Sequence, residues 1–426
     1  MQRIEYKTIG ETLYRDELPN GLRLCVLPKK GFRGRFAAFA ADYGGDARVF
    51  TLDGQRYDTP AGVAHYLEHK MFDMPDGDNA LMLLNANGAD PNAFTGNDMT
   101  CYFFQCTERF EENLRLLLHF VSTPYFTDET VEKERGIISQ EIRMVEDEPG
   151  NRLYYNLLHQ LYARHPIREQ IAGSVESIQA ITAETLHACY RAFYAPSNMC
   201  LCVAGDVEPE SVRQIALETL GGERAPLPAP DYGEPEASLL PVETLRRESM
   251  AVSAPQFLIG ARFESEKPGE GLLRQRLVSQ LALRLLVGAS SPFYTRLYAE
   301  GLLNRDFDYE ADFLSGTAAA LIGGESEQPE KVFEALRAEA ARVAAEGISD
   351  ERFERAKRAS LGARLRGLED FSNVCVSLIT GVFEGYDSLR AIELLDTVEK
   401  AECEAFLREV FAPERLALSI IEPKKD

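Results

Sequence analysis

The sequence has 426 residues, of which 45% are hydrophobic and 27% are charged. This composition is typical of a packed globular protein and not of a disordered one, and the length predicts two or three domains of ordinary size. The 68 acidic residues outnumber the 46 basic ones and leave a net charge of −22. Such a surface repels phosphate backbones and anionic lipids, so neither nucleic acid nor a membrane surface is an expected partner.

Three strands are predicted in the first half of the chain. A Pro-Asn-Gly turn at residues 19–21 opens a strand at 22–27, and its predicted partner at 35–43 ends at two glycines. Residues 99–106 have the β-branched and aromatic content of a third strand.

Two helices are predicted in the first half of the chain. The first is predicted over residues 60–72, because Pro60 suits the first turn of a helix, where its missing N–H is not needed. The second is predicted over 128–145, since Thr127 with two following acidic residues favours a helix start. Strands and long helices without a β-α-β alternation favour an α+β fold over a doubly wound one.

Proline enrichment divides the chain near its middle. Five prolines fall between residues 226 and 241, which excludes a regular helix or a central strand there. We therefore predict a linker at 223–245 between a first domain at 1–222 and a second at 246–426.

The two halves resemble each other. Residues 191–203 match residues 408–420, because in both a helix ends at Ala-Pro and an apolar strand follows. The segment that begins at Thr127 likewise matches the one that begins at Ser349. We expect two homologous α+β domains of about 200 residues each, a normal size for one hydrophobic core.

No targeting or membrane-spanning segment is recognisable. The N-terminal residues lack an apolar signal sequence, and no run of about 18 apolar residues is present. The eight cysteines are dispersed, which without an export signal is typical of buried, reduced thiols. Cys200 and Cys202 share a strand face but lack a second pair to complete a metal or redox site. We expect a cytoplasmic protein.

The six histidines all lie within the first 187 residues, and two of them form a motif with a glutamate. His65, Glu68 and His69 fall on one face of the predicted 60–72 helix, since positions i, i+3 and i+4 are neighbours there. Two such imidazoles can bind one Zn²⁺ and leave a carboxylate beside an open coordination position. A solvated polar helix face is the alternative, which the apolar neighbours of the motif disfavour. The other four histidines occur singly and are interpreted as structural: His119, His159, His165 and His187.

A catalytic zinc site needs a third protein ligand. Glu134 and Glu141 lie seven residues apart, so both project from one face of the predicted 128–145 helix. The matching positions in the second half are Ala356 and Ala363, which indicates that the two glutamates serve a site and not the fold. A surface carboxylate pair is the alternative.

With these residues the chain resembles the pitrilysin-type inverted zinc metallopeptidases, which include insulin-degrading enzyme and the mitochondrial processing peptidase subunits. The resemblance covers nearly the whole chain, and besides the His-x-x-Glu-His motif it rests on residues 88–95, 132–141, 165–166 with Gly173, and 194–206. It implies two homologous domains, each a mostly antiparallel sheet packed with helices, which form half of a clamshell chamber.

The resemblance also implies roles for individual residues. His65, His69 and Glu141 correspond to the zinc ligands and Glu68 to the general base, which would take a proton from the attacking water. Glu134 corresponds to a glutamate that supports the ligands from behind. The spacing between His69 and Glu141 is slightly short for the family, so both glutamates stay open as the third ligand.

Substrate binding is expected at Asn92, Ala93 and Phe94. By resemblance they lie on an edge strand beside the metal, where an extended peptide can add through main-chain hydrogen bonds. A plain turn into a core strand is the alternative for Asn92.

One family feature is missing. Self-sufficient members carry an Arg and a Tyr that reach the substrate from a C-terminal domain, whereas the aligned positions here hold Leu297 and Asn304. The nearby Arg296 and Tyr298 have the wrong spacing to replace them. The sequence therefore favours a zinc endopeptidase subunit that works as a heterodimer with a homologous chain carrying the Arg/Tyr pair, over a homodimer. A zinc-stabilised, non-catalytic peptide-binding or scaffold subunit is the alternative function, which an intact Glu68 disfavours.

Overall fold

The computed structural model describes residues 1–424 and divides into two compact units. The first unit contains residues 1–143, 169–232 and 365–389, and the second contains 144–168, 233–364 and 390–426. The division predicted from the sequence is 1–222, 223–245 and 246–426. It does not include the two segments that cross between the halves, namely 144–168, which belong to the second unit, and 365–389, which belong to the first.

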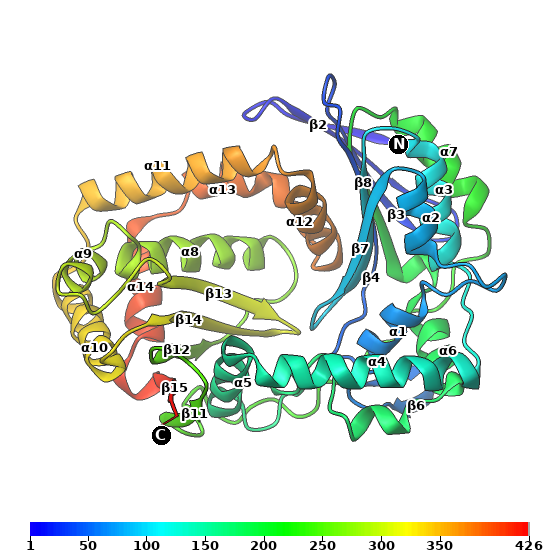
Figure 1. Cartoon of the computed structure of the whole chain (residues 1–426). Helices are drawn as coiled ribbons and strands as arrows, with labels where there is room; N and C mark the ends of the chain where they lie inside the picture. The colour runs from blue at the N-terminus through cyan, green and yellow to red at the C-terminus, as the bar shows by residue number, and fades with distance from the viewer. Residues whose placement is uncertain (425–426) are drawn as a thin grey trace. The chain divides into compact units, whose positions relative to one another are not determined.

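The first unit is built on a seven-stranded sheet (Figure 1). Its spatial order is β1 (Gln2–Tyr6), β2 (Glu11–Glu17), β3 (Arg23–Pro28), β9 (Met199–Gly205), β4 (Arg35–Ala41), β8 (Thr100–Cys106) and β7 (Ala89–Thr95). All neighbouring strands are antiparallel except β3 and β9. A small second sheet contains β10 (Ala229–Pro230), β5 (Val49–Leu52) and β6 (Gln55–Asp58). The strand β7 therefore forms one edge of the main sheet.

The second unit repeats this sheet without the β1–β2 hairpin. Its five strands follow the order β11 (Leu245–Met250), β15 (Ala417–Pro423), β12 (Gln256–Phe263), β14 (Thr317–Glu325) and β13 (Asp308–Leu314). Only β11 and β15 are parallel, as are β3 and β9 at the same place in the first sheet. The identical order and strand directions confirm the predicted internal repeat.

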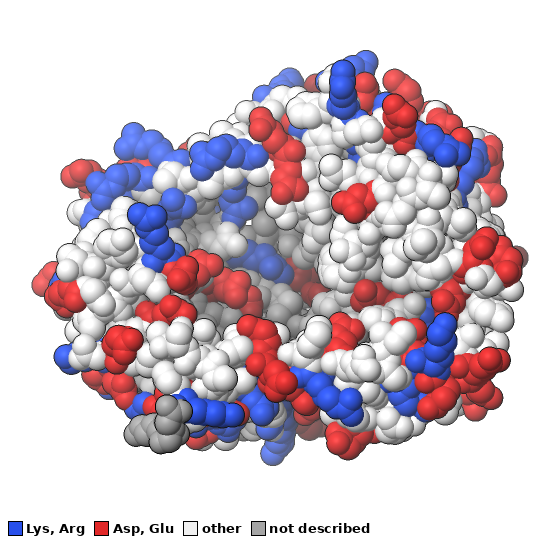
Figure 2. All heavy atoms as spheres, in the orientation of Figure 1, with Lys and Arg blue, Asp and Glu red and all other residues white. Residues whose placement is uncertain are grey.

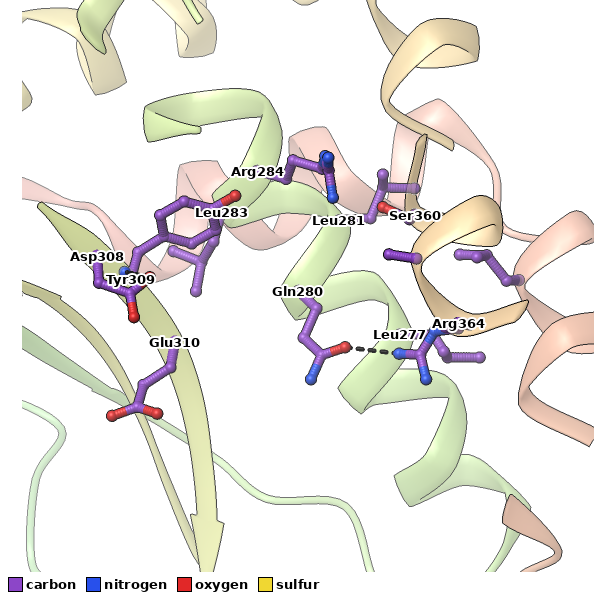
Figure 3. A pocket seen from close by; sticks show the side chains of 12 residues that line it. Leu277, Gln280, Leu281, Leu283, Arg284, Asp308, Tyr309, Glu310, Ser360 and Arg364 are labelled. Atoms are coloured by element: carbon purple, nitrogen blue, oxygen red, sulfur yellow. Dashed lines mark hydrogen bonds between the residues drawn. The ribbon is translucent and has the colours of Figure 1, made fainter. Parts of the chain in front are cut away.

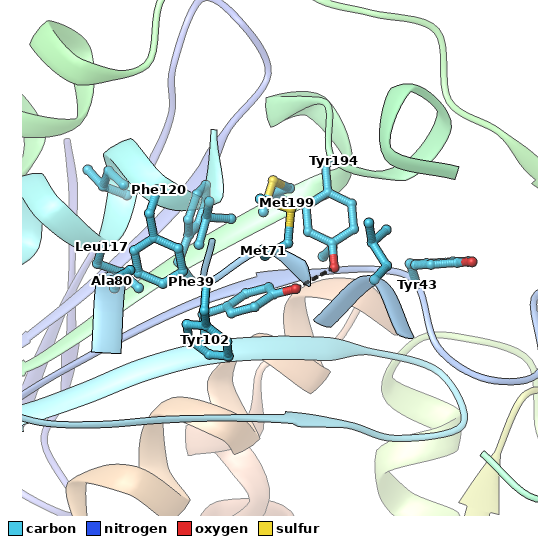
Figure 4. Packing of buried hydrophobic residues seen from close by; sticks show 14 of the residues in the cluster. Phe39, Tyr43, Met71, Ala80, Tyr102, Leu117, Phe120, Tyr194 and Met199 are labelled. Atoms are coloured by element: carbon cyan, nitrogen blue, oxygen red, sulfur yellow. Dashed lines mark hydrogen bonds between the residues drawn. The ribbon is translucent and has the colours of Figure 1, made fainter. Parts of the chain in front are cut away.

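One face of the first sheet carries the main hydrophobic core of its unit (Figure 4). The side chains of Phe39 and Tyr102 point from the sheet toward the helices, and the Tyr102 hydroxyl bonds that of Tyr194 at 2.8 Å. Helices whose residues contribute to this core are α1 (Val63–Lys70), α2 (Ala80–Ala86), α3 (Phe110–Val121), α4 (Asp128–Asp147, through residues 131–142), α6 (Ala183–Phe193) and α7 (Pro209–Thr219).

The opposite face of this sheet is covered by α12 (Phe371–Phe383). Successive side chains of a strand point to opposite faces, so β4 places Phe39 in one core and Ala38 in the other. Five of the eight cysteines lie in this second core, and all eight are buried and free: Cys25, Cys101, Cys200, Cys202 and Cys375 in the core under α12, with Cys106, Cys189 and Cys403 elsewhere.

Two helices exchange places between the repeats. Helix α5 (Pro149–Leu161) follows α4 in the chain but packs on the sheet of the second unit, where its Leu157 approaches β12 at Gly260. Helix α12 follows α11 (Asp350–Gly367) but packs on the sheet of the first unit. The remaining helices of the second unit are α8 (Glu270–Val287), α9 (Pro292–Ala299), α10 (Pro329–Glu346), α13 (Ala391–Asp396) and α14 (Lys400–Val410).

The predicted strands and the long predicted helix are present with shifts of one or two residues at their ends. The prediction that the strands at 22–27 and 35–43 are partners is wrong, because β9 lies between β3 and β4. The first predicted helix is shorter than expected, since α1 begins at Val63 and not at Pro60. Its N-cap is Gly62 with a φ of 93°, which is the left-handed region that favours glycine. Among residues 1–424, no helix is long and apolar enough to cross a membrane.

Asp42 provides a test of how this fold responds to pH. Burial raises the pKa of its carboxyl to about 7, the Arg23 guanidinium opposes the shift, and the charges of Asp98 and Glu384 add to it. The folded protein therefore binds more protons than the unfolded chain between about pH 4 and pH 7, so this residue costs stability as the pH rises through that window.

Asp42→Asn cannot ionise at this position. We expect the difference in unfolding free energy between the variant and wild type to rise by about 1–2 kcal/mol, in favour of the variant, when the pH is raised from 5 to 8. Urea unfolding at both pH values measures the difference. Asp58→Asn, which removes an exposed carboxylate, is the control and should show no such trend. A pH-independent difference for Asp42→Asn would contradict the raised pKa.

Candidate metal and active site

Helix α1 carries the His-x-x-Glu-His motif and is fixed at its start by a close backbone contact. A Cβ on Gly62 would lie 2.4 Å from the carbonyl oxygen of Ala172. The Ser177 hydroxyl also donates to the carbonyl of Ala61 at 2.8 Å. Only a glycine allows this approach, so the segment at 172–177 sets where α1 begins and which face it presents.

Helix α4 is held against α1 by a hydrogen bond and by its apolar face. The hydroxyl of Tyr66, a fully buried residue of α1, donates to the carbonyl of Val131 in α4. Ile138 and Ile142 of α4 are buried in the same core as Leu67 of α1. This packing turns the neighbouring glutamate face of α4 toward the two histidines.

The ligand atoms of His65, His69 and Glu141 converge within 4.8 Å of one another. Nε2 of His65 lies 3.5 Å from Oε1 of Glu141, and Nε2 of His69 lies 3.3 Å from Oε2. Zinc bound at 2.0–2.1 Å from its ligands separates neighbouring ligand atoms by about 3.3 Å in a tetrahedron. The donor types and spacings therefore fit a zinc ion, and these residues could hold one.

Glu134 contacts the cluster from behind and not through the metal position. Its Oε1 lies 2.9 Å from Nδ1 of His69. A neutral His69 donates its Nδ1–H to this carboxylate, which leaves the lone pair of Nε2 directed to the side where Glu141 lies. Among residues 1–424, Nδ1 of His65 has no hydrogen-bond partner.

The charges in the cluster shift the pKa values of its members. Burial opposes the protonation of His69, but the hydrogen bond with Glu134 and the charges of Glu141, Glu134 and Glu68 raise its pKa overall. Hydrogen bonding with His65 lowers the pKa of Glu141, against an opposing effect of burial. Three carboxylates around two imidazoles form an anionic pocket that attracts a cation.

Glu68 is 8% exposed and is held by the edge strand β7. Its Oε2 accepts a hydrogen bond from the Thr95 hydroxyl at 2.5 Å. The Glu68 carboxylate thus lies at the end of β7, the strand on which substrate binding was expected, and on the same side of the sheet as the two histidines.

The three expected substrate-binding residues lie on β7, and β7 is an edge strand. Asn92 is exposed, and its side-chain oxygen accepts the amide N–H of Ala93 at 2.9 Å. Ala93 packs on the α1 side of the sheet, whereas Phe94 packs on the α12 side. The alternative of a plain turn for Asn92 is wrong, because the residue lies within a regular strand.

The remaining histidines lie outside the metal cluster. His159 contacts the Arg168 guanidinium, and the ring of His187 lies 4.8 Å from that of Phe126. His165 is buried and accepts the amide N–H of Ile167, and burial lowers its pKa to about 4. His119 contacts Thr123. These contacts agree with structural roles.

The second unit has a cavity where the first has the histidine cluster (Figure 3). The cavity has a volume of about 460 Å³ and is lined by residues of α8, β13 and α11, with Leu395 of α13. In chain order, α8, β13 and α11 hold the places in their unit that α1, β7 and α4 hold in the first. Ala363 of α11 lines it, at the position that matches Glu141. Arg284, Arg364 and Glu310 also line the cavity, and among the described residues no group that could hold a metal lies there.

The positions aligned with the missing Arg/Tyr pair are occupied by residues with other contacts. Leu297 is 2% exposed in α9. The side chain of Asn304 donates to Asp306 and Glu325. Figure 2 shows Lys and Arg interspersed with Asp and Glu over most of the face in view, and several Lys and Arg gathered at the upper left, over α11.

Known protein families match most of the chain. The model described as "Insulinase (Peptidase family M16)" matches residues 47–175, and "Peptidase M16 inactive domain" matches residues 180–360. The uncharacterized zinc protease YmfH of Bacillus subtilis is 36% identical over 431 residues, which cover 99% of each chain. The uncharacterized zinc protease SCO5738 of Streptomyces coelicolor is 28% identical over 97% of this chain and 90% of its own length.

Solved structures agree with these matches. An M16-like peptidase from Alicyclobacillus acidocaldarius superposes with a TM-score of 0.93 at 33% identity, covering 99% of this chain and all of its own. Pitrilysin has a TM-score of 0.79 at 15% identity and shows the fold alone. The whole of this chain corresponds to 47% of pitrilysin, so it spans about half of that protein.

The geometry predicts distinct metal affinities for two neighbouring glutamates. We expect His65→Ala, His69→Ala and Glu141→Ala to lose bound zinc, because each removes a ligand atom. Glu134→Ala should keep zinc with an affinity lowered by about 10–100-fold, since it removes only the support of His69. Metal content after dialysis and competition with a chelator measure both effects.

The exposed residue Glu129 of the same helix offers the control variant Glu129→Ala, which should bind zinc as wild type does. If Glu134→Ala loses the metal while Glu141→Ala retains it, the two glutamates have the opposite roles.

Proposed function

This chain belongs to the M16 family of peptidases, and from that premise we propose that it is a zinc-dependent endopeptidase acting on peptides or unfolded segments. We propose further that it is the catalytic subunit of a heterodimer with a homologous chain. The observation that carries the proposal is the Glu68 carboxylate, which lies on the same face of α1 as two imidazoles that converge with the Glu141 carboxylate of α4.

The side chains divide the work of peptide hydrolysis. Zinc bound by His65, His69 and Glu141 would supply Lewis-acid chemistry, acidifying a water and polarising the scissile carbonyl. Glu68 accepts the proton of that water and delivers it to the leaving amine, as a general base and then a general acid. Glu134 keeps His69 in the tautomer that binds metal through Nε2.

The edge strand β7 supplies a way to hold an extended substrate. Its outer side is unpaired within the sheet, so a peptide can add to it as another strand. The side chain of Asn92 satisfies the amide of Ala93 in the free protein. A substrate carbonyl would replace that side-chain oxygen, which makes Asn92, Ala93 and Phe94 the substrate-binding residues. Main-chain recognition of this kind tolerates varied side chains.

The proposal of a partner is supported by length, by Leu297 of α9 and by Asn304, which follows that helix. Several structural neighbours are twice as long, with this chain covering 48% of the periplasmic protease PqqL of Escherichia coli. The buried Leu297 cannot contact a substrate, and Asn304 is held by two carboxylates. A homologous subunit would supply the Arg and Tyr that these positions lack.

Glu68→Gln tests the chemistry apart from metal binding. We expect the variant to retain about one zinc per chain and to lose peptide hydrolysis by about 10²–10⁴-fold, because the amide cannot accept a proton. Hydrolysis of a quenched fluorescent peptide and metal analysis measure the two properties. Glu129→Gln should behave as wild type.

Hydrolysis at the wild-type rate by Glu68→Gln would contradict the general-base role. A zinc-loaded wild type that binds peptides but never cleaves them, with or without its partner, would identify the non-catalytic peptide-binding subunit instead. The inactive Glu68→Gln variant also allows strand addition to be tested, since N-methylation of the peptide's amides should weaken binding more than changes of its side chains.

If the active form is a heterodimer, the isolated chain should turn over substrate slowly. We expect a homologous subunit that carries the Arg/Tyr pair to raise kcat at least about 10²-fold, since it adds groups that stabilise the developing oxyanion. Co-expression, mass measurement of the complex and peptide assays test this. Full activity of the chain at a concentration where it is monomeric would contradict it.

A further inference from the structure

Beyond the groups that bind metal or substrate, one side chain contacts the proposed general base directly. Thr95 ends β7, and its hydroxyl oxygen lies 2.5 Å from Oε2 of Glu68. An ionised carboxylate can only accept a hydrogen bond, so the Thr95 hydroxyl is the donor. A bond between a hydroxyl and a charged carboxylate at this distance is among the stronger hydrogen bonds in proteins.

The single proton of Thr95 has no better acceptor. The hydroxyl of Thr100 lies 3.3 Å away, but Thr100 donates its own proton to the carbonyl of Tyr43 at 2.9 Å. The longer contact with Thr100 therefore does not compete with the shorter one to Glu68. The direction of the Thr95 hydroxyl is set by Glu68.

The end of β7 is held rigidly by the segment that follows β4. The amides of Gly45 and Asp46 donate to the carbonyls of Gly96 and Asn97 at 2.9 and 3.0 Å. The Asn97 side chain donates to Asp46 at 3.0 Å. This clamp fixes the β7–β8 turn directly after Thr95, so the hydroxyl has little freedom to move away from Glu68.

We propose that Thr95 is the positioning residue of the general base: it holds one oxygen of Glu68 so that the other is free to take the proton of the attacking water. The hydrogen bond from Thr95 is made to Oε2 and so does not occupy Oε1 of Glu68, which agrees with that division. The proposal rests on the hydrolytic function proposed above and extends it. One strand then serves two purposes, since β7 offers its edge to the substrate and orients the base.

Thr95→Val and Thr95→Ser separate the hydroxyl from the shape of the side chain. Valine has the same shape without the hydroxyl, and serine keeps the hydroxyl. We expect Thr95→Val to lower kcat by about 10–100-fold with KM within about twofold of wild type, since a misplaced group slows the chemical step. Thr95→Ser should stay within about threefold in kcat. Both variants should bind one zinc per chain.

Thr59 provides a matched control for the loss of a buried threonine hydroxyl. It is 7% exposed, and its hydroxyl donates to the carbonyl of Arg48 at 2.8 Å and not to Glu68. Thr59→Val should therefore lose some stability but keep kcat. Equal loss of kcat in Thr95→Val and Thr95→Ser, or an unchanged kcat in Thr95→Val, would overturn the positioning role.

Crystal structures of the two Thr95 variants decide the question without any activity. A Glu68 carboxylate that leaves its position in Thr95→Val and keeps it in Thr95→Ser supports the proposal, and an unchanged carboxylate in both overturns it. If the wild type hydrolyses no peptide in any assay, the proposed hydrolytic function fails, and the structures alone decide whether Thr95 positions Glu68.

Discussion

The close approach of α1 and α4 is the constraint on which the rest of the first unit depends. It places two imidazoles and a carboxylate with their ligand atoms within 4.8 Å, beside two further carboxylates. So many acidic groups repel one another unless a cation lies between them. The structure offsets part of that cost with the Tyr66–Val131 hydrogen bond and the apolar packing beneath it. The fold thus holds these acidic groups in an arrangement that a bound cation would stabilise.

The two units have the same sheet topology, but only the first carries the candidate metal ligands. Both sheets have the same strand order and the same single parallel pair, so the architecture is stable with or without metal ligands. In the second unit the equivalent place is a cavity lined by Ala363, Arg284 and Arg364 (Figure 3). The glutamates of α4 are therefore not required by the fold, which is the strongest argument within the molecule that they serve chemistry.

The sequence predicted the fold class, the internal repeat and a set of residues for the candidate site. The motif at residues 65–69 needed only helical periodicity, and the alanines at 356 and 363 marked the glutamates as special. The sequence did not decide which of Glu134 and Glu141 contacts which histidine atom, because the two glutamates lie on one helix face, two turns apart. The contact of Glu134 with Nδ1 of His69 comes from the rotation of α4 about its axis, which its packing sets. The link between Thr95 and Glu68 was missed, since the two residues lie 27 positions apart and no periodic pattern joins them.

The sequence by itself determined the number of repeats, the chemistry of the donor atoms and the half of the chain that carries them. These follow from local patterns: periodicity, residue type and the similarity of one segment to another. Only the tertiary structure decided that α5 and α12 each pack on the sheet of the other repeat, and that the helix predicted to start at residue 60 begins instead at Val63. Both depend on contacts between distant segments, such as Gly62 against Ala172, and sequence periodicity does not record them. The candidate metal site could be predicted because its residues lie on two regular helices, whereas the contact of Thr95 with Glu68 could not, because it joins a strand to a helix.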